Sequence, residues 1–163
     1  MAVEIIDNFV EQQEFNNLKE IIFSNDFAWY SREKMTDTDS HAWFIHCFYN
    51  TNAIRSEYFP LLKNILDKLN VASIVQIRTN LMLKQHKHYQ SGRHIDYDYN
   101  GKTAILYLNK NNGTTLIYNK NKIQEIQPIE NRMIIFDNRT EHVGQFPTDV
   151  KRRIVINFNY FEK

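Results

Sequence analysis

The sequence places a histidine and an aspartate two positions apart, at His94 and Asp96. In a β-strand, residues i and i+2 point to the same face, so this imidazole and this carboxylate would leave the backbone side by side. Taken alone, such a pair is most often part of a solvated turn. A second histidine, His142, follows a predicted strand over residues 133–136. Two imidazoles and one carboxylate on one face of an octahedral metal suit Fe(II) and leave positions open for other ligands.

An arginine at the start of the last predicted strand is a candidate partner for an anion near that metal. Along residues 153–161, the odd positions include Arg153, Asn157 and Asn159, whereas every even position is apolar or aromatic. The polar face should therefore line an interior cavity while the apolar face packs on helices. Arg152 shares the apolar face, which leaves Arg153 as the candidate. A planar guanidinium can hold a carboxylate through two parallel charge-assisted hydrogen bonds.

Other polar side chains are predicted to face the same interior. Tyr107 lies on the interior face of a neighbouring predicted strand, where its phenol could share the carboxylate with Arg153. It could equally be a core tyrosine with its hydroxyl at the rim. The predicted strand over residues 74–83 carries Arg78 and Asn80 on its polar face, and both are candidates for contact with a co-substrate or a substrate.

Three further residues of metal-binding type receive other interpretations. His86 and His88 also stand two positions apart, but lysines flank them and no acid lies between them. We interpret this stretch as a basic loop over the mouth of the pocket, or as a contact with substrate. Asp98 repeats the spacing of Asp96, yet a fourth protein ligand would close the metal to oxygen. Asp98 is therefore predicted to be a surface acid or to lie behind the ligands.

The composition is that of an ordinary globular protein. A chain of 163 residues with 42% hydrophobic and 24% charged residues is expected to form one domain with its own core. The net charge of +1 gives no overall field that would attract nucleic acid. The single cysteine, Cys47, excludes an internal disulfide and a cysteine-cluster zinc site, and a buried thiol is expected. No signal peptide or apolar run of about 18 residues is recognised, so we expect a cytoplasmic protein that does not associate with a membrane.

Two amphipathic helices are predicted before a series of strands. Apolar residues recur with a helical period over residues 9–22 and 58–69. Proline is tolerated only in the first turn of a helix, so Pro60 indicates that the second helix begins around residues 56–59. The segments with strand-like patterns are residues 28–30, 43–49, 74–83, 103–108, 114–118, 123–126, 133–136 and 153–161. A polar loop is expected over residues 34–40. This order indicates an α+β fold whose strands close or stack, with the helices on one outer face.

Taken together, these motifs resemble those of the 2-oxoglutarate and Fe(II)-dependent oxygenases, in particular the compact branch that includes the prolyl hydroxylases. The resemblance covers roughly residues 74–161, and the segments that carry it are 94–96, 103–109, 112–118, 132–137, His142 and 153–161. It implies a double-stranded β-helix, or jelly roll, over residues 73–163, buttressed by the two helices of residues 1–72. The whole of residues 1–163 would then be one oxygenase domain.

The resemblance also implies roles for the candidate residues. His94, Asp96 and His142 would bind Fe(II), Arg153 would bind the distal carboxylate of 2-oxoglutarate, and Tyr107 would assist. The co-substrate and O2 would be consumed to give succinate and CO2 while a substrate C–H is hydroxylated. The protein would hold that C–H beside the metal and keep the pocket dry.

Three positions depart from the pattern of the family. Asn112 precedes Gly113 where relatives often have two glycines. Met82 stands where many relatives have a tyrosine, so one co-substrate contact is either lost or supplied by Asn80. The nucleic-acid demethylases have a second arginine where this chain has Asn159, which argues against a nucleic-acid substrate.

The leading hypothesis is therefore a hydroxylase of a protein residue, a free amino acid or a small metabolite. One alternative is a cupin-like metalloenzyme that does not use 2-oxoglutarate, which would need three or four histidines and hence His86 or His88. Another is a non-catalytic jelly-roll binding module, suggested by the polar-faced strands and the aromatic residues near Trp29 and Trp43. The sequence defines neither the substrate nor the oligomeric state.

Overall fold

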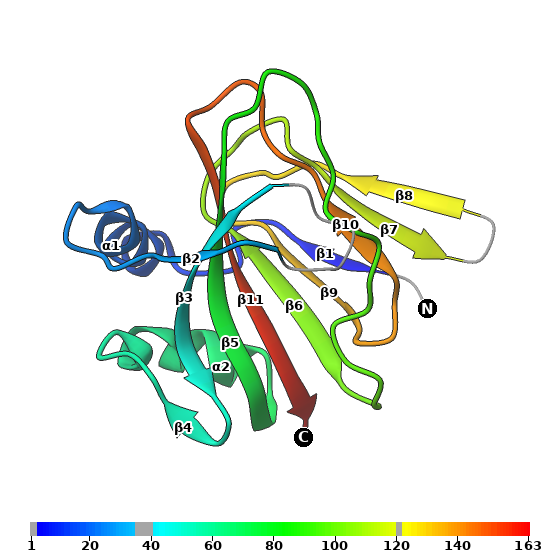
Figure 1. Cartoon of the computed structure of the whole chain (residues 1–163). Coiled ribbons are helices and arrows are strands. Elements are labelled where there is room, and N and C mark those ends of the chain that lie inside the picture. The colour runs from blue at the N-terminus through cyan, green and yellow to red at the C-terminus, as the bar shows by residue number, and fades with distance from the viewer. Residues whose placement is uncertain (1–2, 35–40, 120–121) are drawn as a thin grey trace.

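The computed structural model describes residues 3–34, 41–119 and 122–163, and most of its regular secondary structure is antiparallel strand (Figure 1). The large sheet contains, in spatial order, β1 (Glu4–Ile6), β9 (Met133–Asp137), β6 (Lys102–Tyr107), β11 (Arg152–Glu162), β5 (Val71–Leu83), β3 (Trp43–Asn50) and β2 (Tyr30–Arg32), with β4 (Ala53–Ile54) paired to β3. The small sheet contains β10 (His142–Gly144), β7 (Thr115–Asn119) and β8 (Lys122–Ile126). This arrangement, with few helices, is consistent with a jelly roll. Most of the predicted loop over 34–40 lies outside the described residues.

The helices follow the two amphipathic segments of the sequence. Helix α1 (Gln12–Phe23) begins where the side chain of Glu11 accepts hydrogen bonds from the first free backbone N–H groups. The second segment forms a 3-10 turn, η1 (Phe59–Leu62), followed by the short helix α2 (Lys63–Lys68). This segment is less regular than the single α-helix that the periodicity predicts.

The large sheet is covered on both faces, and each cover has its own core. Figure 1 shows the helices on one side of it and the small sheet on the other. On the helical side, buried residues of α1 and α2 pack on β5, β6 and β11, as Phe15, Ile65 and Leu106 illustrate. On the other side, the core joins the large sheet to the small one through residues such as Val155 and Ile117. The interior between the two sheets is where polar side chains gather.

Strand β11 divides its side chains between these two interiors. Its apolar residues, including Ile156 and Phe158, belong to the core on the helical side, as the alternation predicts. Arg152 also points to that side, where its Nη2 donates to the Phe23 carbonyl at 3.0 Å. Arg153 points the other way and is 3% exposed. The strand therefore separates the two neighbouring arginines as expected.

The first 72 residues contribute strands to the large sheet as well as helices. Strand β1, which the sequence pattern does not predict, pairs with β9, and β3 pairs with β5. Strand β10 was not predicted either, since it has only three residues. Within the described residues, no helix is long and apolar enough to cross a membrane.

Candidate active site

A short backbone bridge brings the two candidate histidines together. His94 and His142 are antiparallel partners, with N–H to carbonyl distances of 3.2 and 2.9 Å, and their ring centroids lie 4.5 Å apart. The expectation that residues 94–96 form a strand is wrong, because His94 is an isolated bridge and Asp96 lies at a bend in the connection between β5 and β6. The pairing with His142, rather than a strand, is what orients His94.

The ligand atoms of His94, Asp96 and His142 lie within 4.8 Å of one another. Asp96 Oδ1 is 3.8 Å from the Nε2 atom of each histidine. The Nδ1 atom of His94 lies 2.7 Å from the Gly92 carbonyl, and that of His142 lies 3.0 Å from the Thr140 carbonyl. When Nδ1 donates to a carbonyl, the lone pair of Nε2 is free for a metal. The donor set therefore fits a divalent metal, Fe(II) included.

The second oxygen of Asp96 is held by the protein. Asp96 Oδ2 accepts hydrogen bonds from Asn159 Nδ2 at 2.7 Å and from Thr103 Oγ1 at 3.0 Å. Burial raises the pKa of Asp96, but His142, Arg78 and the Asn159 hydrogen bond together lower it below its usual value. The carboxylate is therefore ionised and presents Oδ1 to the histidines.

The protonation state of His142 also suits metal binding. Burial lowers the pKa of its imidazole, and the neighbouring Asp96 only partly opposes this effect. His142 is therefore neutral near pH 7, which is the form that a metal ion requires.

Arg153 lies buried with no acidic partner. Its Nε donates to the Gly113 carbonyl at 2.8 Å, its Nη2 to Thr115 Oγ1 at 3.0 Å, and its Nη1 lies 3.1 Å from Met82 Sδ. No ion pair in the described part of the chain includes Arg153. A buried guanidinium without a carboxylate is costly unless an anion neutralises it, so this position is suited to an anionic ligand.

The Thr115 hydroxyl contacts both Tyr107 and Arg153. The Tyr107 phenol is fully buried and donates to Thr115 Oγ1 at 2.7 Å. Burial raises the Tyr107 pKa, so the phenol keeps its proton. Thr115, which the sequence pattern did not single out, lines the cavity next to the metal ligands, whereas Tyr107 lies behind it.

A cavity joins the histidines to Arg153. Its volume is about 40 Å³, and its lining includes His94, His142, Arg153 and Asn80. Trp43 and Arg78 also line it. Buried polar atoms there have no hydrogen-bond partner within the described residues, namely Asn80 Oδ1, Trp43 Nε1 and Arg78 Nε. Unpartnered polar atoms gathered around one cavity are expected where a ligand supplies the missing contacts.

The remaining candidates lie apart from this centre. Asp98 is a surface acid that accepts a hydrogen bond from Arg139 at 2.8 Å. His88 Nδ1 lies 3.1 Å from the Phe146 carbonyl, and the His86 ring packs edge-on against Tyr89. In the part of the chain that the structure describes, the only metal-binding cluster is the one that contains His94. This finding does not favour the cupin-like alternative, which needs His86 or His88.

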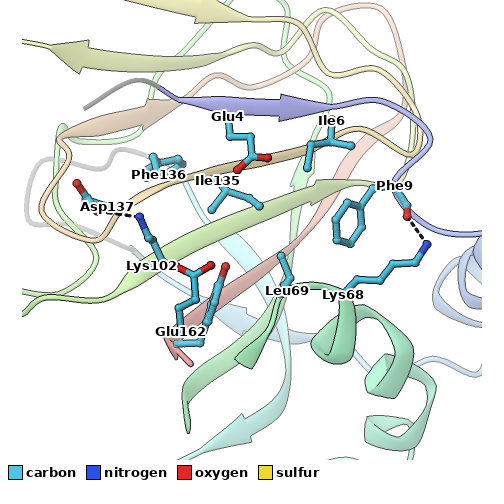
Figure 2. A pocket seen from close by; sticks show the side chains of 11 residues that line it. Glu4, Ile6, Phe9, Lys68, Leu69, Lys102, Ile135, Phe136, Asp137 and Glu162 are labelled. Atoms are coloured by element: carbon cyan, nitrogen blue, oxygen red, sulfur yellow. Dashed lines mark hydrogen bonds and ion pairs between the residues drawn. The ribbon is translucent and has the colours of Figure 1, made fainter. Parts of the chain in front are cut away.

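A second hollow lies on the helical side of the large sheet (Figure 2). Its volume is about 280 Å³, and both lysines of its lining have partners within the protein. Lys68 donates to the Phe9 carbonyl at 2.9 Å, and Lys102 pairs with Asp137 at 3.3 Å. None of the three candidate metal ligands belongs to the lining of this hollow, so it is not part of the candidate active site.

The mostly antiparallel strands and the cluster of two histidines with one aspartate define a jelly-roll-like protein with a candidate site for one metal ion. Residues 80–161, about half of the chain, match the family model described as the 2OG-Fe(II) oxygenase superfamily, and the chain belongs to that superfamily. Members use Fe(II), 2-oxoglutarate and O2, and His94, Asp96 and His142 could bind the metal. A comparison with curated proteins found no match.

Several solved structures share the fold. A prolyl-4-hydroxylase from Pseudomonas putida matches with a TM-score of 0.74 and 12% identity, over 99% of this chain and 93% of its own. A prolyl hydroxylase from Trichoplax adhaerens, solved with a peptide fragment of the hypoxia inducible factor oxygen degradation domain, has a TM-score of 0.71 and 19% identity, over 98% and 83%. The alpha-ketoglutarate dependent epimerase SnoN from nogalamycin biosynthesis has a TM-score of 0.69 and 8% identity, over 98% and 77%. The fold therefore serves more than one reaction.

Proposed function

We propose that this protein is a hydroxylase, in which His94, Asp96 and His142 hold Fe(II) and Arg153 binds the distal carboxylate of 2-oxoglutarate. One atom of O2 would enter succinate as 2-oxoglutarate loses CO2, and the other would enter a substrate C–H bond as a hydroxyl group. Bound Fe(II) would supply the centre at which O2 and 2-oxoglutarate react. The substrate would be a protein residue or a small amino-acid-like compound.

The observation that carries this proposal is the environment of Arg153. Its buried guanidinium has no acidic partner, and it stands in the same cavity as the two histidines. Thr115 Oγ1 already accepts hydrogen bonds from Tyr107 and Arg153, so the Thr115 proton is free to be donated. A carboxylate at this position would accept a hydrogen bond from the Thr115 hydroxyl and would form an ion pair with Arg153. Tyr107 would act through Thr115, and Asn80 would contact the co-substrate.

The jelly roll would hold the metal ligands and Arg153 in fixed positions relative to one another. We propose that the large and small sheets form a double-stranded β-helix, with α1 and α2 as its buttress. Arg153 is held on three sides, by Gly113, Met82 and Thr115. Because its rotamer is constrained by these contacts, little entropy would be lost when the co-substrate binds.

The test is turnover of purified protein with Fe(II) and 2-oxoglutarate, followed as succinate release. Arg153→Ala should raise the 2-oxoglutarate concentration needed for half-maximal turnover by about 100-fold, since a buried charge-assisted contact is lost. Arg152→Ala is the matched control, because its side chain contacts Phe23 on the opposite face. An unchanged requirement in Arg153→Ala would reject the assigned pocket.

A further inference from the structure

A wide groove lies next to the candidate active site, across β2, β3 and β5. Its volume is about 720 Å³, which is in the range of small-molecule sites. The basic residues that line it are Arg32, Lys34, Arg55 and Arg78. No aspartate or glutamate occurs among the described residues of its lining. We call this feature the basic groove.

The basic groove and the metal cavity occupy one face of the large sheet. In the register of the strands, Arg78 on β5 is opposite Cys47 on β3 and opposite Asn157 on β11. Directly opposed residues point to the same face. Cys47 lines the groove, Asn157 lines the metal cavity, and Arg78 lines both. Arg78 therefore stands where the groove meets the cavity.

Arg78 has no partner to account for its position. Its Nε is buried and unpaired, and no hydrogen bond or ion pair within the described residues includes its guanidinium. Asp96 lies near enough to influence it, yet Asp96 Oδ2 is already held by Thr103 and Asn159. The Arg78 side chain is half-buried, and only its Nε atom is both buried and unpaired, so its outer nitrogens are open to an anion that enters the groove.

The surroundings of Arg78 on the groove side add positive charge. Arg32 is close enough to disfavour the charged form of Arg78. Cys47 supplies no negative charge, because burial raises its thiol pKa and the Sγ atom lies 3.6 Å from the Tyr49 carbonyl. Asp96 is the acid that acts on Arg78, and it lies on the metal side, so the described lining of the groove itself offers an anion positive charge only.

A second cation marks the outer part of the groove. Arg55 Nε donates to the Asn50 carbonyl at 3.3 Å, and Asn50 is paired with Gln76 on β5. Gln76 is two residues from Arg78, which corresponds to about 7 Å along a strand. Arg55 therefore marks a second positively charged point of the groove, and it lies outside the lining of the metal cavity.

We propose that the basic groove binds the substrate of this oxygenase and that the substrate is a small dicarboxylate. One carboxylate pairs with Arg78 beside the metal centre, and the other is bound near Arg55. The C–H bond that reacts lies close to the carboxylate held by Arg78. This inference rests on the proposed function, and in place of the protein residue or amino-acid-like compound considered there it assigns a small molecule with two carboxylates. It assigns the dicarboxylate to a different place from 2-oxoglutarate, which Arg153 binds.

The experiment is calorimetric titration of straight-chain dicarboxylates of four to eight carbons into protein saturated with Mn(II) and 2-oxoglutarate. Prior saturation fills the Arg153 pocket, so that heat reports a second site. At least one member of the series should bind the wild type, and Arg78→Gln and Arg55→Gln should each weaken it by about 10-fold or more. Lys122→Gln, an exposed lysine on β8, makes the same charge change away from the groove and should have no effect.

The outcomes separate this inference from the proposed function. If Mn(II) and 2-oxoglutarate bind but no dicarboxylate does, the inference is overturned while the proposed function stands. Binding that is equally strong in Arg78→Gln and Arg55→Gln also overturns it, as does binding of a polyglutamate peptide alone. If 2-oxoglutarate does not bind in the presence of Mn(II), the proposed function fails first. Arg55 lies outside the metal cavity, so Arg55→Gln should keep the response to Mn(II) and 2-oxoglutarate.

Discussion

Asp96 presents one oxygen to the histidines because Thr103 and Asn159 hold the other. Such contacts fix a ligand before the metal arrives and are typically worth 10 to 100-fold in metal affinity. The polar residues of the interior face therefore do more than fill space, since they orient the carboxylate.

Thr103→Val should weaken Mn(II) binding by about 10-fold, because the hydroxyl that donates to Asp96 is lost while the shape is kept. The measurement is the concentration of free Mn(II), followed by electron paramagnetic resonance during a titration. Thr103→Ser keeps the hydroxyl and should retain most of the affinity. Equal affinities in the wild type and Thr103→Val would show that this hydrogen bond does not position the carboxylate.

Met82 lies against Arg153, with its Sδ atom 3.1 Å from Arg153 Nη1. A thioether is a weak acceptor, and Arg153 is also held by Gly113 and Thr115. We therefore expect Met82→Leu to change the 2-oxoglutarate affinity by less than about threefold, since the two side chains have similar volumes. Titration of the Mn(II)-loaded protein measures this. A loss as large as that of Arg153→Ala would instead make Met82 an essential contact.

The connection between β6 and β7 supports Arg153 through its backbone. Gly113 accepts the Arg153 Nε–H, and its backbone does not have a positive φ. The glycine is required by space, because an added Cβ would lie 2.5 Å from the Gln145 carbonyl oxygen and 3.0 Å from Pro147 N. The connection would have to move away from those backbone atoms to admit any side chain.

Gly113→Ala should consequently lower the melting temperature of the unliganded protein by several degrees and should also weaken 2-oxoglutarate binding. Differential scanning calorimetry and a co-substrate titration are the measurements. Gly144→Ala is a control for stability, because its added Cβ would meet no atom closer than 3.7 Å. If both variants melt at the same temperature, the close packing around Gly113 does not constrain the connection.

His46 connects β3 to two flanking segments. Its Nδ1 is 2.8 Å from the Ala28 carbonyl and its Nε2 is 2.7 Å from Ser56 Oγ. Burial lowers the pKa of His46 below its usual value of 6.5. As the pH falls below 6.5, the unfolded chain binds a proton that the folded chain resists, so stability decreases.

Thermal unfolding of the metal-free protein at a series of pH values tests this effect. The wild type should lose stability as the pH falls from 7 through about 6, while His46→Gln should lose less over the same interval. The comparison between the two proteins removes the contribution of the other histidines. If the two proteins lost stability in parallel as the pH falls, the pKa of His46 would be the same in the folded and the unfolded chain.

Strands whose polar and apolar side chains alternate can be predicted from the sequence. Contacts between residues far apart in the sequence cannot be predicted in this way. The alternation along β11 was enough to place Arg153 in the interior and Arg152 on the helical side. The bridge between His94 and His142 depends on two connections meeting in space, which no local pattern records. Thr115 is a comparable case, because its importance comes from the neighbours that the small sheet brings to it.

On the scale of the whole molecule, the candidate active site lies where the two sheets meet. The large sheet supplies Arg153 and the partners of Asp96, whereas His142 and Thr115 belong to the small sheet. The connection between β5 and β6 adds His94 and Asp96. A metal that binds all three ligands would therefore tie this connection to both sheets, and a co-substrate would link Arg153 on the large sheet to Thr115 on the small one.

Mn(II) and 2-oxoglutarate together should consequently raise the melting temperature by more than the sum of their separate effects. Ligands that bind only the folded form stabilise it by mass action, and the co-substrate should bind more tightly once the metal is present. Thermal unfolding with neither ligand, each ligand and both ligands measures this coupling. Asp96→Ala should abolish the response to Mn(II), and Arg153→Ala should keep that response while losing the additional effect of 2-oxoglutarate. Strictly additive shifts in the wild type would mean that the metal and the co-substrate occupy independent sites, which would contradict a shared cavity between the two sheets.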